Sequence, residues 1–190
     1  MRVFAALPLP HAAAAGLAAA IEPLRRVHPR LRWVSPSGFH LTLHFFGEID
    51  DRAVKTLKAV FADDRLRVPQ IPARFGSLGQ FPEQGSPRVI HAALDKGGEE
   101  AREFHDRFHA LIAPLGYEAD ARGFAPHITV ARAGAERLDP GWEAGSELPR
   151  RDFLIGECVL YQSILGPGGS RYAALASVSF GQENERERLS

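Results

Sequence analysis

Residues 38–47, GFHLTLHFFG, combine leucines, aromatic residues and a threonine in a run that predicts a β-strand. The same order of histidine, apolar residue, threonine and apolar residue returns within residues 124–134, FAPHITVARAG. The chain has eight histidines and only three threonines, which are Thr42, Thr56 and Thr129. Random placement would give roughly 0.1 His-x-Thr pairs, so finding two is an event on the order of one per cent. The repeat therefore indicates a shared structural or chemical purpose.

The spacing within each motif puts its two polar side chains together. Residues two apart on a strand point to the same face of a sheet, so His40 lies beside Thr42 and His127 beside Thr129. Two such strands facing each other across a groove would line it with two imidazoles and two hydroxyls. Hydroxyls can hold phosphate oxygens, and imidazoles release or take up a proton near neutral pH. The pattern predicts attack on a phosphodiester without a metal, and a 2',3'-cyclic phosphate suits it because both alkoxide positions lie close together.

Composition describes an ordinary globular chain of 190 residues, with 45% hydrophobic and 24% charged residues. The formal net charge is zero, which argues against a broad basic surface for long nucleic acids. Twenty of the 23 basic residues are Arg, which indicates either a local phosphate-binding patch or a general use of Arg in place of Lys. Cys158 is the only cysteine, so no intrachain disulfide or cysteine-based zinc cluster can form, and a cytoplasmic protein is expected.

Hydrophobic periodicity assigns most of the chain to strands and helices. The expected strands are residues 2–9, 31–34, 39–49, 68–81, 87–94, 125–132, 150–165 and 170–180. The expected helices are residues 10–26, 50–64 and 97–116. Prolines make 68–81 either an interrupted strand or an edge segment. A signal peptide at the N-terminus is disfavoured because Pro8, Pro10 and His11 interrupt its apolar part.

The order β-α-β-β-α-β-β-α-β-β-β predicts an α+β fold in which helices flank antiparallel sheets. The two motifs lie 87 residues apart, which predicts a bilobal molecule with one motif in each lobe. We therefore expect two antiparallel sheets, pseudo-twofold lobes and a cleft between them. Residues 1–181 would form this single domain, and the polar residues 182–190 would form a frayed tail.

The motifs and their surroundings resemble a known family. HLTL at 40–43 and HITV at 127–130 are similar to the paired His-x-Thr-x motifs of the 2H phosphoesterase superfamily. The wider resemblance, to the RNA 2',3'-cyclic phosphodiesterases or 2'-5' RNA ligase family, rests on WVSPSGFHLTLHFFGEI, PRVIHAAL, FAPHITVAR and QSILGPGGSRYAAL. It covers nearly the whole chain. It implies a bilobal α+β enzyme that hydrolyses RNA 2',3'-cyclic phosphate ends to 2'-phosphomonoesters, with reversible 2'-5' ligation as a second reaction.

The resemblance also implies roles for five residues. His40 would be the proton donor and His127 the proton acceptor. Thr42 and Thr129 would bind the phosphate, and Arg132 would neutralise its charge. Neither a metal nor another cofactor is implied. The expected partner is an RNA end with a 2',3'-cyclic phosphate. The expected oligomeric state is a monomer.

Three further positions have alternative interpretations. Arg132 lies five residues after His127, so it reaches the same face only if the strand ends or bulges before it, and otherwise it is a surface charge. His44 lies four residues after His40 and in a regular strand would share its face, where it could contact substrate or cap the sheet edge. Tyr172 follows GGSR and could either approach the substrate or only pack.

Other residues are expected to have simpler roles. Phe45 and Phe46 are expected in the core. His91 stands at a position that is often aromatic in the family. Because it departs from that pattern, no base-stacking role is carried over to it. A metal site at His40 and His44 lacks a nearby Asp, Glu or Cys to complete it. Two rival functions remain: a phosphodiesterase for small cyclic phosphates or oligoadenylates, and a nucleotide-binding module without turnover.

Overall fold

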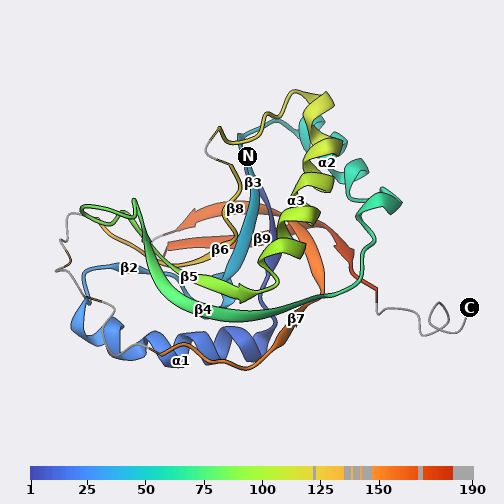
Figure 1. Ribbon diagram of the computed structural model, residues 1–190. Coiled ribbons are helices and arrows are strands. Elements are labelled where there is room, and N and C mark those ends of the chain that lie inside the picture. Colours follow the sequence, from blue (N-terminus) through green and yellow to red (C-terminus); the bar gives the residue numbers. More distant parts are fainter. Residues whose placement is uncertain (122, 135–137, 139–141, 143–146, 167–168, 182–190) are drawn as a thin grey trace, which may run out of the picture.

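The computed structural model describes residues 1–121, 123–134, 138, 142, 147–166 and 169–181 (Figure 1). The helices are α1 (His11–Val27), α2 (Asp51–Val60) and α3 (Gly98–Ile112), with short 3-10 helices at Pro36–Gly38, Asp64–Leu66 and Ala113–Leu115. The strands are β1 (Arg2–Pro8), β2 (Arg32–Trp33), β3 (His40–Glu48), β4 (Ile71–Phe81), β5 (Val89–Lys96), β6 (His127–Arg132), β7 (Phe153–Ile155), β8 (Glu157–Gly166) and β9 (Gly169–Ser179). The predicted tail, 182–190, lies outside the described residues.

The helices form where the sequence predicted them, and local signals account for their ends. Every third or fourth residue of α1 is buried, namely Ala14, Leu17, Ile21 and Leu24. The α2 helix begins after Asp50, whose carboxylate accepts a hydrogen bond from the backbone N–H of Ala53 at 2.8 Å. No helix in the described part of the chain is long and apolar enough to cross a membrane.

The strands form one curled antiparallel sheet in the order β7-β4-β5-β6-β3-β1-β8-β9, with β2 paired to β6 (Figure 1). The α+β class is confirmed, but the expectation of two separate sheets is corrected. The strands β3 and β6, which carry the two motifs, pair with each other through Leu41 and Ile128. This one pair joins the half made of β7, β4, β5, β6 and β2 to the half made of β3, β1, β8 and β9. Sequence patterns alone do not reveal the pairing because the partners lie far apart in the chain.

Each half of the sheet has its own apolar core. The α2–α3 core packs those helices on β1, β3 and β8, and includes Val3, Ala5, Leu7, Leu41, Leu43, Phe46, Leu57, Phe104, Phe108 and Leu160. The α1 core packs that helix on β4, β5 and β6, and includes Leu17, Ile21, Phe39, Phe75, Leu78, Ile90, Ala92, Ile128 and Val130. In Figure 1, α1 lies along one side of the sheet, and α2 and α3 lie together on the other side.

Two strand predictions change in detail. The expected single strand 150–165 is two strands, because the chain pairs with β4 through β7, breaks at Gly156 and then pairs with β1 and β9 through β8. The proline-interrupted segment is a true strand between β5 and β7, in which Pro72 lies opposite Leu154 of the short strand β7.

Candidate active site

His40 and His127 begin their strands and are fixed in the same way. The Nδ1 atom of His40 donates a hydrogen bond to the carbonyl oxygen of Gly38 at 2.7 Å, and that of His127 donates to the carbonyl oxygen of Ala125 at 2.7 Å. A carbonyl oxygen only accepts, so Nδ1 carries the proton in both rings. The Nε2 atom of each ring is then left to exchange a proton with a bound molecule.

A β-bulge follows the threonine of both motifs. In the pairing of β3 with β1, Leu43 is the extra residue directly after Thr42. In the pairing of β6 with β5, Val130 is the extra residue directly after Thr129. A bulge shifts the alternation of side chains, so residues after it exchange faces relative to a regular strand. The two motifs therefore share a backbone irregularity as well as a sequence.

On β6 the bulge returns Arg132 to the face of His127. Val130 and Ala131 are both buried, whereas Arg132 is exposed, so burial no longer alternates at this point. The sequence analysis required the strand to end or bulge before Arg132 if this residue was to share the face of His127, and the bulge at Val130 provides that irregularity. After burial and an opposing backbone hydrogen bond, the positive charge of Arg132 contributes to lowering the pKa of both motif histidines.

The surroundings of both rings favour the neutral imidazole. Burial lowers the pKa of His40 to about 4; the hydrogen bond to Gly38 opposes this, and the charges of Arg132 and His127 add to it. Burial also lowers the pKa of His127, with an opposing hydrogen bond to Ala125 and a further lowering by Arg132. A bound phosphate anion would raise both pKa values because it stabilises the charged ring.

Aromatic residues surround His40. The ring of Phe4 lies 5.0 Å from that of His40, and Tyr172 lies edge-on at 5.4 Å. Tyr172 thus borders His40 and also packs against Phe4, at 5.0 Å. The expectation that Phe45 is in the core is corrected: its side chain is 64% exposed and packs on Phe4 at 5.8 Å. The bulge on β3 brings Phe45 to the face of His40, while Phe46 is buried as expected.

The expectation that His44 shares the face of His40 is also corrected. It assumed a regular strand, and the bulge at Leu43 turns His44 to the opposite face. The ring contacts of His44 are with Phe46 at 4.8 Å, Tyr117 at 6.0 Å and His109 at 6.5 Å. His40 and His44 therefore do not approach each other as metal ligands would, and no group of three or more metal-ligating side chains occurs among the described residues.

Two rings that the motifs did not identify lie beside His127. Phe81 lies edge-on to His127 with ring centroids 5.0 Å apart, and His91 lies 5.4 Å from it. Phe81 and His91 stack on each other at 4.3 Å. His91 pairs with Thr129 across β5 and β6. The sequence could not identify Phe81 because its position depends on the pairing of β4 with β5.

Two histidines on adjoining strands, each with its Nδ1 bound to a backbone carbonyl oxygen and a threonine on its face, are the arrangement expected of the 2H phosphoesterase class. The chain belongs to the 2'-5' RNA ligase superfamily, whose family model matches residues 10–165. It is 34% identical to the RNA 2',3'-cyclic phosphodiesterase of Thermus thermophilus over 203 aligned positions, covering 99% of this chain and 94% of that protein. The enzyme of the same name from Aeropyrum pernix is 29% identical over 153 positions, covering 78% of this chain and 85% of that protein.

Solved structures agree with this membership. A crystal structure of a protein from Thermus thermophilus superimposes with a TM-score of 0.77 and 29% identity, covering 97% of this chain and 100% of that one. The structure of E. coli LigT complexed with 3'-AMP has a TM-score of 0.71 and 24% identity, covering 95% and 98%, a likeness of fold alone. The family assignment made from the motifs is confirmed, and so is the prediction of an enzyme of this family.

Proposed function

We propose that this chain hydrolyses RNA 2',3'-cyclic phosphate ends to 2'-phosphomonoesters by two-histidine acid–base catalysis without a metal. The observation that carries the proposal is the matched pair of Nδ1–carbonyl hydrogen bonds, which leaves the Nε2 atoms of His40 and His127 for the substrate. The name shared by the curated relatives supports the choice of substrate.

In this reaction the two rings act on opposite oxygens of one phosphorus atom. Neutral His127 takes a proton from water at Nε2 as the water oxygen attacks phosphorus. Protonated His40 gives its Nε2 proton to O3' as the bond from phosphorus to O3' breaks. The product keeps the phosphate on O2', and both protons are accounted for.

The other motif residues act on the non-bridging oxygens. The hydroxyls of Thr42 and Thr129 donate hydrogen bonds to them, and Arg132 stabilises the charge that grows in the transition state. The same negative charge favours the protonated form of His40, which its surroundings disfavour in the free protein. Substrate binding thus increases the fraction of His40 that is protonated and able to act as the general acid.

The aromatic surface beside His40 favours a nucleotide over a bare cyclic phosphate. Tyr172 and the exposed Phe45 offer stacking surfaces, and every nucleobase has a flat face that can use them. This supports RNA ends as substrate, whereas small cyclic phosphates and oligoadenylates are the alternative. With the 5'-hydroxyl of a second RNA attacking phosphorus in place of water, the same groups in the same roles would join that RNA to the cyclic end. We further propose a cytoplasmic monomer, consistent with the free, buried thiol of Cys158.

The test is to incubate the protein with a short RNA that ends in a 2',3'-cyclic phosphate, with and without EDTA, and identify the product. We expect a 2'-phosphate in both conditions. His40→Ala and His127→Ala should each lower the rate by on the order of 10²–10⁴-fold, while the exposed His11→Ala is the control. Loss of activity in EDTA that a divalent ion restores contradicts the metal-free mechanism. Substrate binding without any turnover supports the nucleotide-binding alternative.

A further inference from the structure

The carbonyl oxygens that hold the two motif histidines lie in different kinds of structure. Gly38, the acceptor for His40, is buried in the 3-10 helix Pro36–Gly38, and its own N–H donates to the carbonyl oxygen of Ser35 at 2.8 Å. Ala125, the acceptor for His127, is exposed and lies in the segment before β6, outside any helix or strand. The first acceptor is therefore fixed by local structure, whereas the second needs support from elsewhere in the fold.

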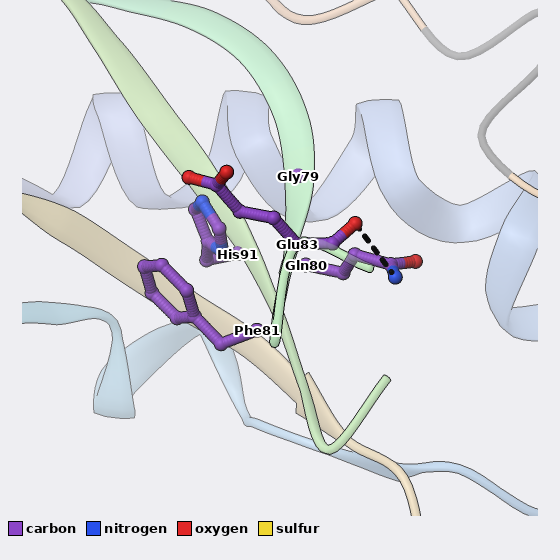
Figure 2. Close-up of a pocket in the computed structure, with 5 residues that line it drawn as sticks. All are labelled: Gly79, Gln80, Phe81, Glu83 and His91. Atoms are coloured by element: carbon purple, nitrogen blue, oxygen red, sulfur yellow. Dashed lines mark hydrogen bonds between the residues drawn. The ribbon is translucent and has the colours of Figure 1, made fainter. Parts of the chain in front are cut away.

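Packing around His127 does not by itself fix its ring. Phe81 lies edge-on to it with ring centroids 5.0 Å apart, and His91 lies 5.4 Å from it. Both of these neighbours line a cavity of about 280 Å³ (Figure 2). Because they border empty space, they leave the ring of His127 room to move. The hydrogen bond to Ala125 therefore has to set both the orientation of the ring and the nitrogen that carries the proton.

Phe124, directly before Ala125 in the chain, supports this carbonyl group. The ring of Phe124 stacks on that of His105 in α3, with centroids 4.1 Å apart and planes 5° apart. Phe124 is partly buried against the α2–α3 core, whereas Gly123 and Ala125 on either side of it are exposed. Pro126 follows Ala125 and disfavours helical backbone at that residue. The link is therefore short and stiff, and a displacement of Phe124 would pass to the carbonyl oxygen of Ala125.

His105 provides a firm surface for this stack. It is buried, and its Nδ1 donates a hydrogen bond to a carboxylate oxygen of Asp106 at 3.0 Å. That bond and the surrounding side chains fix the plane of the imidazole. The helix that carries His105 packs Phe104 and Phe108 into the α2–α3 core. The ring that Phe124 meets is therefore held by the core of the molecule rather than by the exposed segment itself.

We propose that His105 is a positioning residue for the proton acceptor: by stacking on Phe124, it places the carbonyl oxygen of Ala125 where it selects the Nδ1-protonated form of His127. In that form Nε2 has a free lone pair and can take the proton of the attacking water. In the other neutral tautomer Nε2 already carries a proton and cannot act as the base. The proposal rests on the role of His127 under the proposed function. Without the stack, both tautomers should be populated and fewer molecules should be able to react.

The experiment reads the tautomer of His127 from long-range nitrogen–proton NMR correlations of the histidine-labelled protein at mildly alkaline pH. The signals of His127 are those that disappear in His127→Ala. We expect a single Nδ1-protonated tautomer in the native protein. His105→Leu, which removes the flat ring but keeps the position apolar, should give a mixture of tautomers at His127 and leave His40 unchanged. It should also lower kcat for a cyclic-ended RNA by roughly tenfold, with KM within about twofold, because the base and not the binding of substrate is disturbed.

Two variants separate positioning from general packing. His105→Phe keeps a flat ring for Phe124 and should retain the single tautomer, with kcat within about threefold of the native value. Phe108→Leu is the matched control for lost packing, because Phe108 is fully buried on the same helix and its ring packs on Phe61 at 5.8 Å. It should lower the temperature of thermal unfolding and leave the tautomer of His127 unchanged.

A single Nδ1-protonated tautomer of His127 in folded His105→Leu overturns the proposal. A mixture of tautomers in Phe108→Leu also overturns it, since the effect would then come from loosened helix packing. If His105→Leu does not fold, Phe124→Leu removes the other ring of the stack and should give the same mixture and the same loss of kcat. A native protein that does not hydrolyse cyclic-ended RNA refutes the proposed function instead, and the tautomer of His127 still decides the role of His105.

Discussion

At the scale of single residues, His40 and His127 each donate an Nδ1 hydrogen bond to a backbone carbonyl oxygen, and the same cause favours the neutral form of both rings. Burial is the main cause of their lowered pKa values, and the charge of Arg132 lowers both further. Catalysis requires one neutral and one protonated ring, so the rate should follow a bell-shaped pH profile. The apparent pKa values of the acidic and basic limbs belong to the coupled pair of histidines rather than to either residue.

Arg132→Gln tests this coupling. Removing the guanidinium charge should raise both histidine pKa values, and the profile of kcat/KM should move to higher pH by roughly half to one unit. The value of kcat/KM should also fall on the order of 10²-fold because the growing phosphate charge loses its partner. Arg25→Gln, an exposed change in α1, serves as the control. A profile that keeps its position, or moves to lower pH, would mean that Arg132 is not near the rings in solution.

At the scale of elements, the pairing of β3 with β6 sets the separation of the two histidines. Leu41 and Ile128, which form this pair, are fully buried, each in a different core. Leu41→Ala should lower the free energy of unfolding by about 2–5 kcal/mol, as large-to-small changes in cores do. It should also lower kcat in conditions where the protein stays folded, since small displacements of catalytic groups cost much rate.

Leu57→Ala in α2 is the matched control, because Leu57 is equally buried in the same core but lies in a helix rather than in either motif strand. Urea unfolding and turnover of a cyclic-ended RNA measure the two effects. We expect similar losses of stability in both variants and a loss of kcat only in Leu41→Ala. Equal kcat values would show that the spacing of the histidines does not depend on this pair.

Elements also show how far the sequence could predict the site. Alternation identified the motif strands and the shared faces of His40 and Thr42, because both precede the bulge on β3. It misplaced His44 and Phe45, which follow that bulge, since an inserted residue leaves no mark in a hydrophobic pattern. The stack of Phe81 on His91 was beyond prediction because it depends on which strands become neighbours.

At the scale of the whole molecule, two cores raise the question of whether residues 1–181 form one domain. The strand β4 contributes Ala73 to the α2–α3 core and Phe75 to the α1 core. The first strand similarly provides Leu7 to the α2–α3 core, and Leu9 just beyond it packs in the α1 core. A segment that belongs to both cores cannot leave one without disturbing the other. We therefore propose a single cooperative unit.

The native aromatic residues allow a direct measurement of this cooperativity. The two tryptophans of the chain, Trp33 and Trp142, both pack against the α1 core, so their fluorescence reports on that half. Far-UV circular dichroism reports on the sheet and on all helices, including α2 and α3. If the molecule unfolds as one unit, thermal transitions followed by the two probes should coincide, as two-state unfolding requires. A fluorescence transition displaced by several degrees from the dichroism transition would instead mean that the α1 half unfolds separately, and residues 1–181 would then be two domains joined through β3 and β6.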